Sequence, residues 1–124
     1  MDLHPAMAGH LHAVTQDAQR LREVWAAEGV LEFPYATADM TARIEGVDAL
    51  VAYFDGSRRW SDWTFELVDA VEDRTRRLHV AEIHAEATWT QTGEPYVQDY
   101  VIWMALDEDG RIRSWREYWD KARV

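Results

Sequence analysis

The segment RRLHVAEIHAEATWTQTGEPYVQDYVIWMAL, residues 76–106, decides the fold. Apolar and polar side chains alternate on both sides of a turn at Thr92-Gly93, which predicts two long antiparallel strands. Alternation also predicts a strand over 63–71 before this pair and another over 112–119 after it. The four strands follow one another as a meander, so a single curved antiparallel sheet is the simplest arrangement.

The residues before this sheet are mainly helical. Apolar side chains recur every three or four residues from Met7 to Trp25, which predicts one helix ending near Gly29, or two helices with a kink at Thr15. A short strand over 30–35 and a second helix over 48–53 follow. Helices followed by strands indicate an α+β fold, in which the helices pack on the concave face of a cone-shaped sheet that encloses a pocket. We expect one domain over residues 1–124.

The composition excludes several classes of protein. Thirteen Lys and Arg against 23 Asp and Glu give a net charge of −10, which repels nucleic acid. No apolar run approaches the roughly 18 residues of a membrane span, and the first residues lack the pattern of a signal peptide, so we expect a cytoplasmic protein with no membrane partner. The absence of cysteine excludes disulfides and thiolate chemistry. Fifteen aromatic residues indicate a large aromatic core.

No motif for a cofactor or a metal is present. The sequence has no glycine-rich phosphate loop, no dinucleotide fingerprint and no serine-nucleophile motif. His10 and His12 lack the i, i+4 spacing that places two ligands on one helical face. We therefore expect a protein that works without a cofactor or metal ion.

The last predicted strand carries the strongest candidate for chemistry. Alternation places Trp115, Glu117 and Trp119 on one face. A carboxyl group between two large apolar neighbours is desolvated, which raises its pKa and suits it to act as a general acid or base. The alternative is an exposed face on which Glu117 pairs with Arg113 or Arg111.

Two further groups of acids share this pattern. Asp99 lies on an otherwise apolar face of the third long strand, either as a catalytic group or as an acid bonded to the backbone. Glu82, His84 and Glu86 share one face of the second long strand, where the carboxylates could orient the imidazole. The alternative is that this second face is simply solvated.

Three short motifs point to a known superfamily. The segment 46–50, GVDAL, is similar to a Gly-Arg-Glu-x-Leu helix start, and 60–65, WSDWTF, is similar to a Phe-Pro-Asp-Trp-x-Trp segment of phenazine-biosynthesis A/B-type proteins. The segment 116–119, REYW, is similar to endings found in SnoaL-like polyketide cyclases and limonene epoxide hydrolases. The chain thus resembles the nuclear-transport-factor-two-like superfamily, whose fold is a cone-shaped α+β barrel.

The resemblance implies roles for particular residues. It places Glu117 in the cavity as the acid or base, and it places His84 and Glu86 where epoxide hydrolases have an Arg-x-Asp pair. Tyr53 and Ser57 fall near a His and a Ser on a helix of the phenazine proteins, which is a partial match.

Other positions depart from the relatives. Leu31 and Phe33 replace the Tyr and Asn that hold water in epoxide hydrolases, which argues against that mechanism. Phe33 and Ile102 replace the two acids of ketosteroid isomerases, which argues against that form of isomerisation.

The sequence therefore favours a cofactor-free acid–base catalyst of cyclase, isomerase or dehydratase type, acting on a small carbonyl-containing intermediate of secondary metabolism. The expected catalytic residues are Glu117, His84, Glu86 and Asp99, and the expected substrate-binding residues are Phe33, Tyr53, Ser57, Glu82, Trp103 and Trp115. The alternatives are a non-catalytic ligand-binding or structural module, a subunit of a larger complex that uses the outer face of the sheet, and an epoxide hydrolase. A homodimer formed through the outer face is expected in each case.

Overall fold

A computed structural model of the chain describes residues 2–56 and 59–123. The elements are α1 (Pro5–Gln16), the 3₁₀ turn η1 (Ala18–Arg20), α2 (Leu21–Val24), β1 (Trp25–Glu32), β2 (Arg43–Glu45), α3 (Val47–Asp55), β3 (Trp60–Asp73), β4 (Leu78–Trp89), β5 (Pro95–Leu106), β6 (Ile112–Trp119) and the 3₁₀ turn η2 (Lys121–Arg123). No helix among these is long and apolar enough to cross a membrane.

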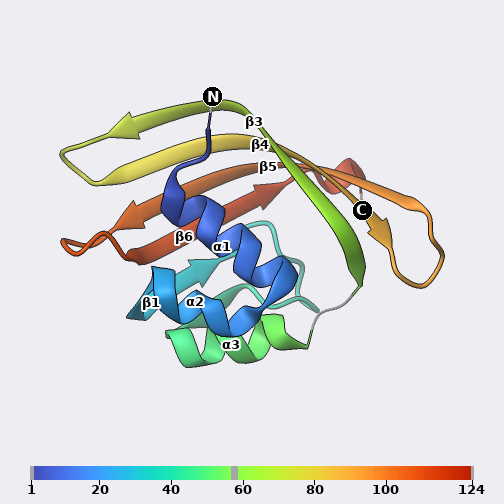
Figure 1. Ribbon diagram of the computed structural model, residues 1–124, viewed down its shortest axis with the longest axis horizontal. Helices are drawn as coiled ribbons and strands as arrows, with labels where there is room; N and C mark the ends of the chain where they lie inside the picture. The colour runs from blue at the N-terminus through green and yellow to red at the C-terminus, as the bar shows by residue number, and fades with distance from the viewer. Residues whose placement is uncertain (1, 57–58, 124) are drawn as a thin grey trace.

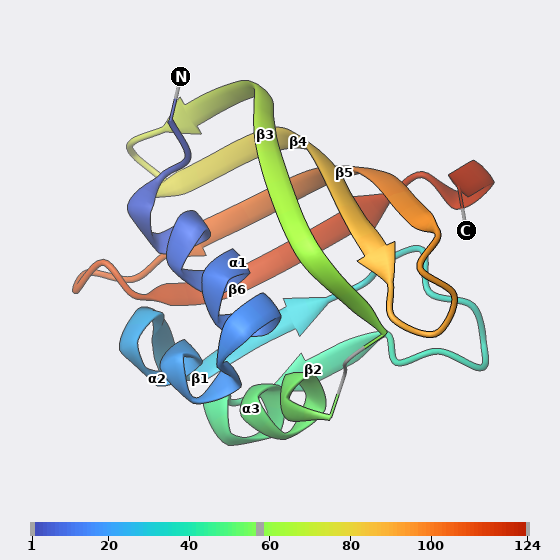
Figure 2. The same cartoon turned by 45° about the vertical axis from the view of Figure 1, so that its right-hand side comes forward.

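The six strands form one curved sheet in the order β2-β1-β6-β5-β4-β3. β1 and β6 run parallel, whereas every other neighbouring pair is antiparallel. The helices α1, α2 and α3 lie on one side of the sheet, and β3 sweeps around the end of α1 (Figures 1 and 2). The prediction of an α+β fold with helices on the concave face of a curved sheet is therefore confirmed, with one parallel pair that the meander did not predict.

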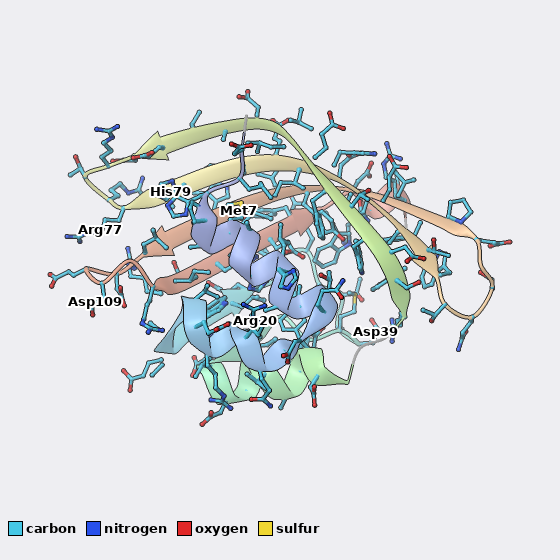
Figure 3. All side chains as sticks on the ribbon, in the orientation of Figure 1. Met7, Arg20, Asp39, Arg77, His79 and Asp109 are labelled. Atoms are coloured by element: carbon cyan, nitrogen blue, oxygen red, sulfur yellow. The ribbon has the colours of Figure 1, made fainter. Side chains whose placement is uncertain are left out.

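Alternation along the long strands sorts their side chains between core and surface. On β4, Ala81 and Ile83 face the helices and are buried, and on β5 the same face carries Ile102 and Met104. From the opposite side, Met7 of α1 packs into this core, whereas the hairpin tips point away from the body of the molecule, as the labels of Arg77 and Asp109 show (Figure 3). The hydrophobic core thus lies between the sheet and the helices.

The prediction of one helix reaching Gly29 is wrong, and the alternative of two helices is correct. α1 ends at Gln16, because Asp17 leaves the helical conformation and its side chain accepts a hydrogen bond of 3.1 Å from the backbone N–H of Gln19. The apolar repeat continued through this break to Trp25, which is the first residue of β1. Apolar spacing alone did not reveal the change from helix to strand.

Gly29 lies inside β1 rather than at a helix end. A Cβ atom there would approach the ring of Trp25 to 2.5 Å and the carbonyl oxygen of Ile112 to 2.9 Å. The pairing of β1 with β6 is irregular at this point, between Trp25 and Val30. The glycine is therefore required by the close approach of β6 and a side chain, not by a helix cap.

Candidate functional site

A cavity of about 420 Å³ separates the helices from the concave face of the sheet. Its walls are mostly aromatic and come from α1, from the loop after β1, from α3 and from β3 to β6. The aromatic lining residues are Phe33, Tyr53, Phe54, Trp60, Trp63, Phe65, Trp89, Tyr96, Tyr100 and Trp119. Its exposed rim includes Met40 and Arg59, at the end of the molecule that Asp39 marks in Figure 3. A cavity of this size and lining suits a small, flat, apolar molecule.

Glu117 brings a carboxyl group into this aromatic cavity. It lies on the concave face of β6 between Trp115, which is fully buried, and Trp119, which lines the cavity. The indole Nε1 of Trp115 donates a hydrogen bond of 3.2 Å to Glu117 Oε1. Burial raises the pKa of Glu117 to about 7, against the opposing effect of this hydrogen bond. At neutral pH the side chain can therefore both accept and donate a proton.

The alternative pairing of Glu117 with an arginine does not occur. Arg113 donates through Nε to the carbonyl oxygen of Leu106, and Arg111 donates to the carbonyl oxygens of Arg22 and Trp25. Within residues 2–56 and 59–123, Glu117 forms no salt bridge. Its carboxylate is thus uncompensated by a positive charge.

Two tyrosines surround this carboxyl group. Tyr53 of α3 and Tyr100 of β5 both line the cavity. Burial raises the pKa of each phenol, and the nearby charge of Glu117 raises both further, while the positive charge of Arg59 opposes the effect on Tyr53. Both phenols therefore remain protonated at neutral pH and can donate hydrogen bonds.

His10 is a cavity residue that the sequence prediction missed. It lies on α1, is 1% exposed and lines the same cavity as Glu117. Its Nδ1 accepts a hydrogen bond of 3.0 Å from Trp25 Nε1, and its ring centroid is 4.0 Å from that of Trp115. Burial lowers the pKa of His10 to about 3, so the ring is neutral. Its spacing of three residues from Met7 on the apolar stripe was the available signal.

A cluster of four rings forms part of the cavity wall. Trp60, Trp63, Trp89 and Tyr96 pack with ring centroids between 4.7 and 6.0 Å apart. Among the described side chains, Trp60 Nε1 is the one fully buried nitrogen or oxygen without a hydrogen-bond partner. It is an unsatisfied donor within the cavity wall, covered by the surrounding atoms.

The remaining predicted catalytic residues lie on the other side of the sheet. His84 Nδ1 is 2.7 Å from Asp99 Oδ1, and His84 Nε2 is 3.2 Å from Glu86 Oε2, so the three groups do come together. The hydrogen bond to Asp99 is the main cause that raises the pKa of His84. Arg123 Nε contacts Asp99 Oδ2 at 3.0 Å. Ile83 and Ala85, the chain neighbours of His84, are buried on the core side of β4, so the sheet separates this cluster from the cavity and from Glu117.

The predicted substrate-binding residues divide in the same way. Phe33 and Tyr53 line the cavity, and Trp115 supports it from beneath through its contacts with Glu117 and His10. Glu82 lies on the outer face, beside a second, shallower hollow that Asp99 also lines. Trp103, also on the outer face, lies 4.8 Å beneath the guanidinium of Arg116. Ser57 is outside the described residues.

A curved sheet with helices and a buried acid on its concave side defines the class of cone-shaped α+β proteins. Residues 9–115 match the SnoaL-like domain, and the chain belongs to this family.

Three similar proteins illustrate the relationship. A PhzA/B-like protein of Pseudomonas aeruginosa, itself uncharacterised, is 30% identical over 107 residues, which cover 86% of this chain and 75% of the relative. The crystal structure of a candidate isomerase from Bacillus subtilis has a TM-score of 0.76 at 28% identity and covers 92% of this chain and 82% of its own. A Mycobacterium tuberculosis protein in complex with estradiol-17β-hemisuccinate has a TM-score of 0.75 at 17% identity, covers 95% and 93% of the two chains, and shows a shared fold.

Proposed function

We propose that this protein is a cofactor-free acid–base catalyst of isomerase or cyclase type. It moves a proton at a carbon atom next to a carbonyl group in a small, flat and largely apolar compound. The observation that carries the proposal is Glu117, a half-buried side chain at the wall of an aromatic cavity, whose desolvated carboxyl group has a pKa of about 7. A base with this pKa is present in useful amounts both as carboxylate and as carboxylic acid near neutrality.

The geometry around Glu117 supports this role. Trp115 holds Oε1, so Oε2 is the oxygen left to contact a substrate, and the rings of the cavity wall desolvate the carboxyl group. Glu117 removes a proton from the α-carbon, the C–H electrons form a carbon–carbon double bond, and the carbonyl oxygen becomes an enolate oxygen. Return of the proton to another carbon, or attack of the enolate on a second carbonyl group, completes an isomerisation or a cyclisation without any oxidant.

The lining indicates the class of substrate. The walls are planar rings, which suit a mono- or polycyclic compound. Arg59 at the exposed rim carries a positive charge in a protein whose net charge is −10, and it suits an acidic substituent of the same compound. The ligand of the Mycobacterium neighbour, estradiol-17β-hemisuccinate, has both features, although that likeness concerns the fold alone.

Binding without catalysis is the second candidate function. The number of rings around the cavity favours it, because stacking and burial alone would hold a planar ligand. An epoxide hydrolase is less well supported, since Leu31 is fully buried and Phe33 presents only a hydrocarbon ring where a water-holding side chain is needed.

Exchange of α-hydrogens in D₂O separates catalysis from binding. The probe is 2-tetralone, a bicyclic ketone with acidic α-hydrogens, followed by proton NMR. We expect the wild-type protein to accelerate the exchange and Glu117→Gln to lose about 100-fold or more of the acceleration. Glu66→Gln, which neutralises an exposed carboxylate on the outer face, is the matched control. Acceleration that survives in Glu117→Gln contradicts the proposal, and bound 2-tetralone without exchange favours the binding function.

A further inference from the structure

Among the described residues, two buried polar side chains have no role in the proposed proton transfer, His10 and Gln98, and His10 is the one that lines the cavity. It belongs to α1, which lies across the cavity from the strands, and only 1% of its surface is exposed. A histidine buried to this degree among the rings of Trp25, Phe54 and Trp115 needs a reason, because burying an imidazole without satisfying its nitrogens is unfavourable.

The hydrogen bond from Trp25 fixes the tautomer of His10. An indole N–H can only donate, so His10 Nδ1 must accept and cannot carry a proton. The neutral ring then carries its single proton on Nε2. Because burial lowers the pKa of His10 to about 3, this tautomer persists over the whole neutral range.

The Nε2–H group of His10 faces the cavity. No hydrogen bond to it is formed within residues 2–56 and 59–123. Among the described side chains, Trp60 Nε1 is the one unpaired nitrogen or oxygen that is fully enclosed by protein. Nε2 of His10 is therefore unpaired without being fully enclosed, and we infer that it is open to the cavity that His10 lines. It is a donor of fixed direction in an aromatic pocket.

A single indole connects His10 to Glu117. The Trp115 ring packs against the His10 ring at 4.0 Å between centroids and donates its N–H to the Glu117 carboxyl group. A base and a neutral hydrogen-bond donor are therefore held by the same side chain and line the same cavity. Enolisation of a carbonyl compound needs this combination, a base for the α-hydrogen and a donor for the oxygen that becomes negative.

We propose that His10 is a further catalytic residue, whose Nε2–H donates a hydrogen bond to the carbonyl oxygen of the substrate. This inference rests on the proposed function and names the carbonyl compound as its substrate class. When Glu117 takes the α-proton, the electron pair of the C–H bond moves through the new carbon–carbon double bond to the oxygen. His10 stabilises that oxyanion without giving up its proton, and reprotonation at carbon restores the starting state of both residues.

The test compares two ligands that differ in one oxygen. At pH 8, where Glu117 is a carboxylate and can only accept hydrogen bonds, tryptophan fluorescence measures the binding of 2-tetralone and of its hydrocarbon counterpart tetralin. We expect the wild-type protein to prefer 2-tetralone and His10→Phe to lose about tenfold of that preference, with tetralin binding preserved. His10→Gln places an amide N–H near the position of Nε2 and should retain most of the preference.

Nuclear magnetic resonance of the wild-type protein provides a readout that needs no variant. The ¹⁵N shifts of His10 should show a proton on Nε2 from pH 5 to pH 9, and 2-tetralone, but not tetralin, should shift the Nε2–H resonance. A proton on Nδ1, an equal affinity of the wild-type protein for both ligands, or a preference retained in His10→Phe would each overturn the proposal.

The two proposals fail in different measurements. Loss of the preference for 2-tetralone in His10→Phe, together with unchanged exchange in Glu117→Gln, supports the role of His10 in binding the oxygen and rejects Glu117 as the base. The reverse result retains Glu117 and assigns the carbonyl oxygen to another donor, such as the phenol of Tyr53 or of Tyr100.

Discussion

Trp115 Nε1 donates a hydrogen bond of 3.2 Å to Oε1 of Glu117, two residues further along the same strand. The bond stabilises the charged form of a carboxyl group that burial otherwise keeps neutral, so the pKa of about 7 is the balance of two opposing effects. Side chains at i and i+2 share a face of a strand, which is why one face of β6 can carry both groups.

Removal of this donor should shift the pH dependence of catalysis. In Trp115→Phe the hydrogen bond is lost while the ring remains apolar, so the pKa of Glu117 should rise by about half a unit to one unit. The measurement is the midpoint of the pH–rate profile for exchange of 2-tetralone. A midpoint that stays the same or falls would show that the bond does not stabilise the carboxylate.

Replacement of Glu117 should change stability in a pH-dependent way. The folded-state pKa of about 7 lies above the unfolded value near 4.5, so the folded chain binds the proton more tightly. Stability from this group is present below pH 4.5 and is lost as the pH rises through 7. Glu117→Gln should therefore be more stable than wild type at pH 8, by up to about 3 kcal/mol, and should match it at pH 4.

Chemical denaturation at the two pH values measures this difference. Glu66→Gln, on the exposed face of β3, serves as the control and should show no such crossover. A Glu117→Gln protein that is less stable than wild type at pH 8 would contradict the burial of an unpaired carboxylate.

His10 should make the protein sensitive to acid. Its folded-state pKa of about 3 lies below the unfolded value of 6.5. Between these two pH values the ring is protonated in the unfolded chain and neutral in the folded chain. Stability from the neutral ring is present above pH 6.5 and falls by up to about 1.4 kcal/mol per pH unit below it. In a Glu117→Gln background, which removes the opposing titration, His10→Phe should flatten this slope, whereas His12→Gln, on the exposed side of α1, should leave it unchanged.

Arg59 should discriminate between charged and neutral ligands. We compare 8-anilinonaphthalene-1-sulfonate with N-phenyl-1-naphthylamine, which has the same rings without the sulfonate group. Because Arg59 is exposed at the rim, Arg59→Gln should weaken binding of the anion by about threefold to fivefold and leave binding of the neutral compound unchanged. Arg74→Gln, in the distant hairpin turn, is the control, and an equal loss for both compounds would assign Arg59 a structural role.

The homodimer expected from the sequence has a candidate surface on the outer face. Val71, Val80 and Trp103 are adjacent across β3, β4 and β5, and Val71 is 65% exposed. We expect sedimentation at micromolar concentration to give twice the monomer mass of 14.5 kDa, and Val71→Asp to shift the protein toward the monomer. A monomeric wild-type protein would contradict this expectation.

The sequence predicted the fold better than it predicted the site. Alternation of period two is a strong local signal, so the bounds of β6 were correct and Glu117 was placed on the same face as Trp115 and Trp119. The same signal sorts residues into two faces without saying which face the helices cover. For β4 the choice depended on distant packing, so the predicted roles of His84 and Glu86 in the cavity could not be tested by pattern alone.

His10 was missed for a different physical reason. A polar residue on an apolar stripe weakens the helical pattern, and nothing local indicates that Trp25, fifteen residues later and on a strand, satisfies its Nδ1. The break at Asp17 that turns the chain toward this contact is a capping interaction of a single side chain.

The parallel pairing of β1 with β6 has a consequence for how the protein folds. Leu31 pairs with Trp115 across about two thirds of the length of the chain, whereas the hairpins of β3, β4, β5 and β6 join neighbouring segments. Pairing of neighbouring strands in a hairpin costs little chain entropy, whereas pairing of β1 with the distant β6 costs more. The meander of β3 to β6 should therefore form before the N-terminal segment docks. During synthesis, the pairing of β1 with β6 cannot form until β6 has left the ribosome. Because burial raises the pKa of Glu117 and α1 of that segment forms part of the cavity wall, this pKa should reach its final value only after the N-terminal segment has docked.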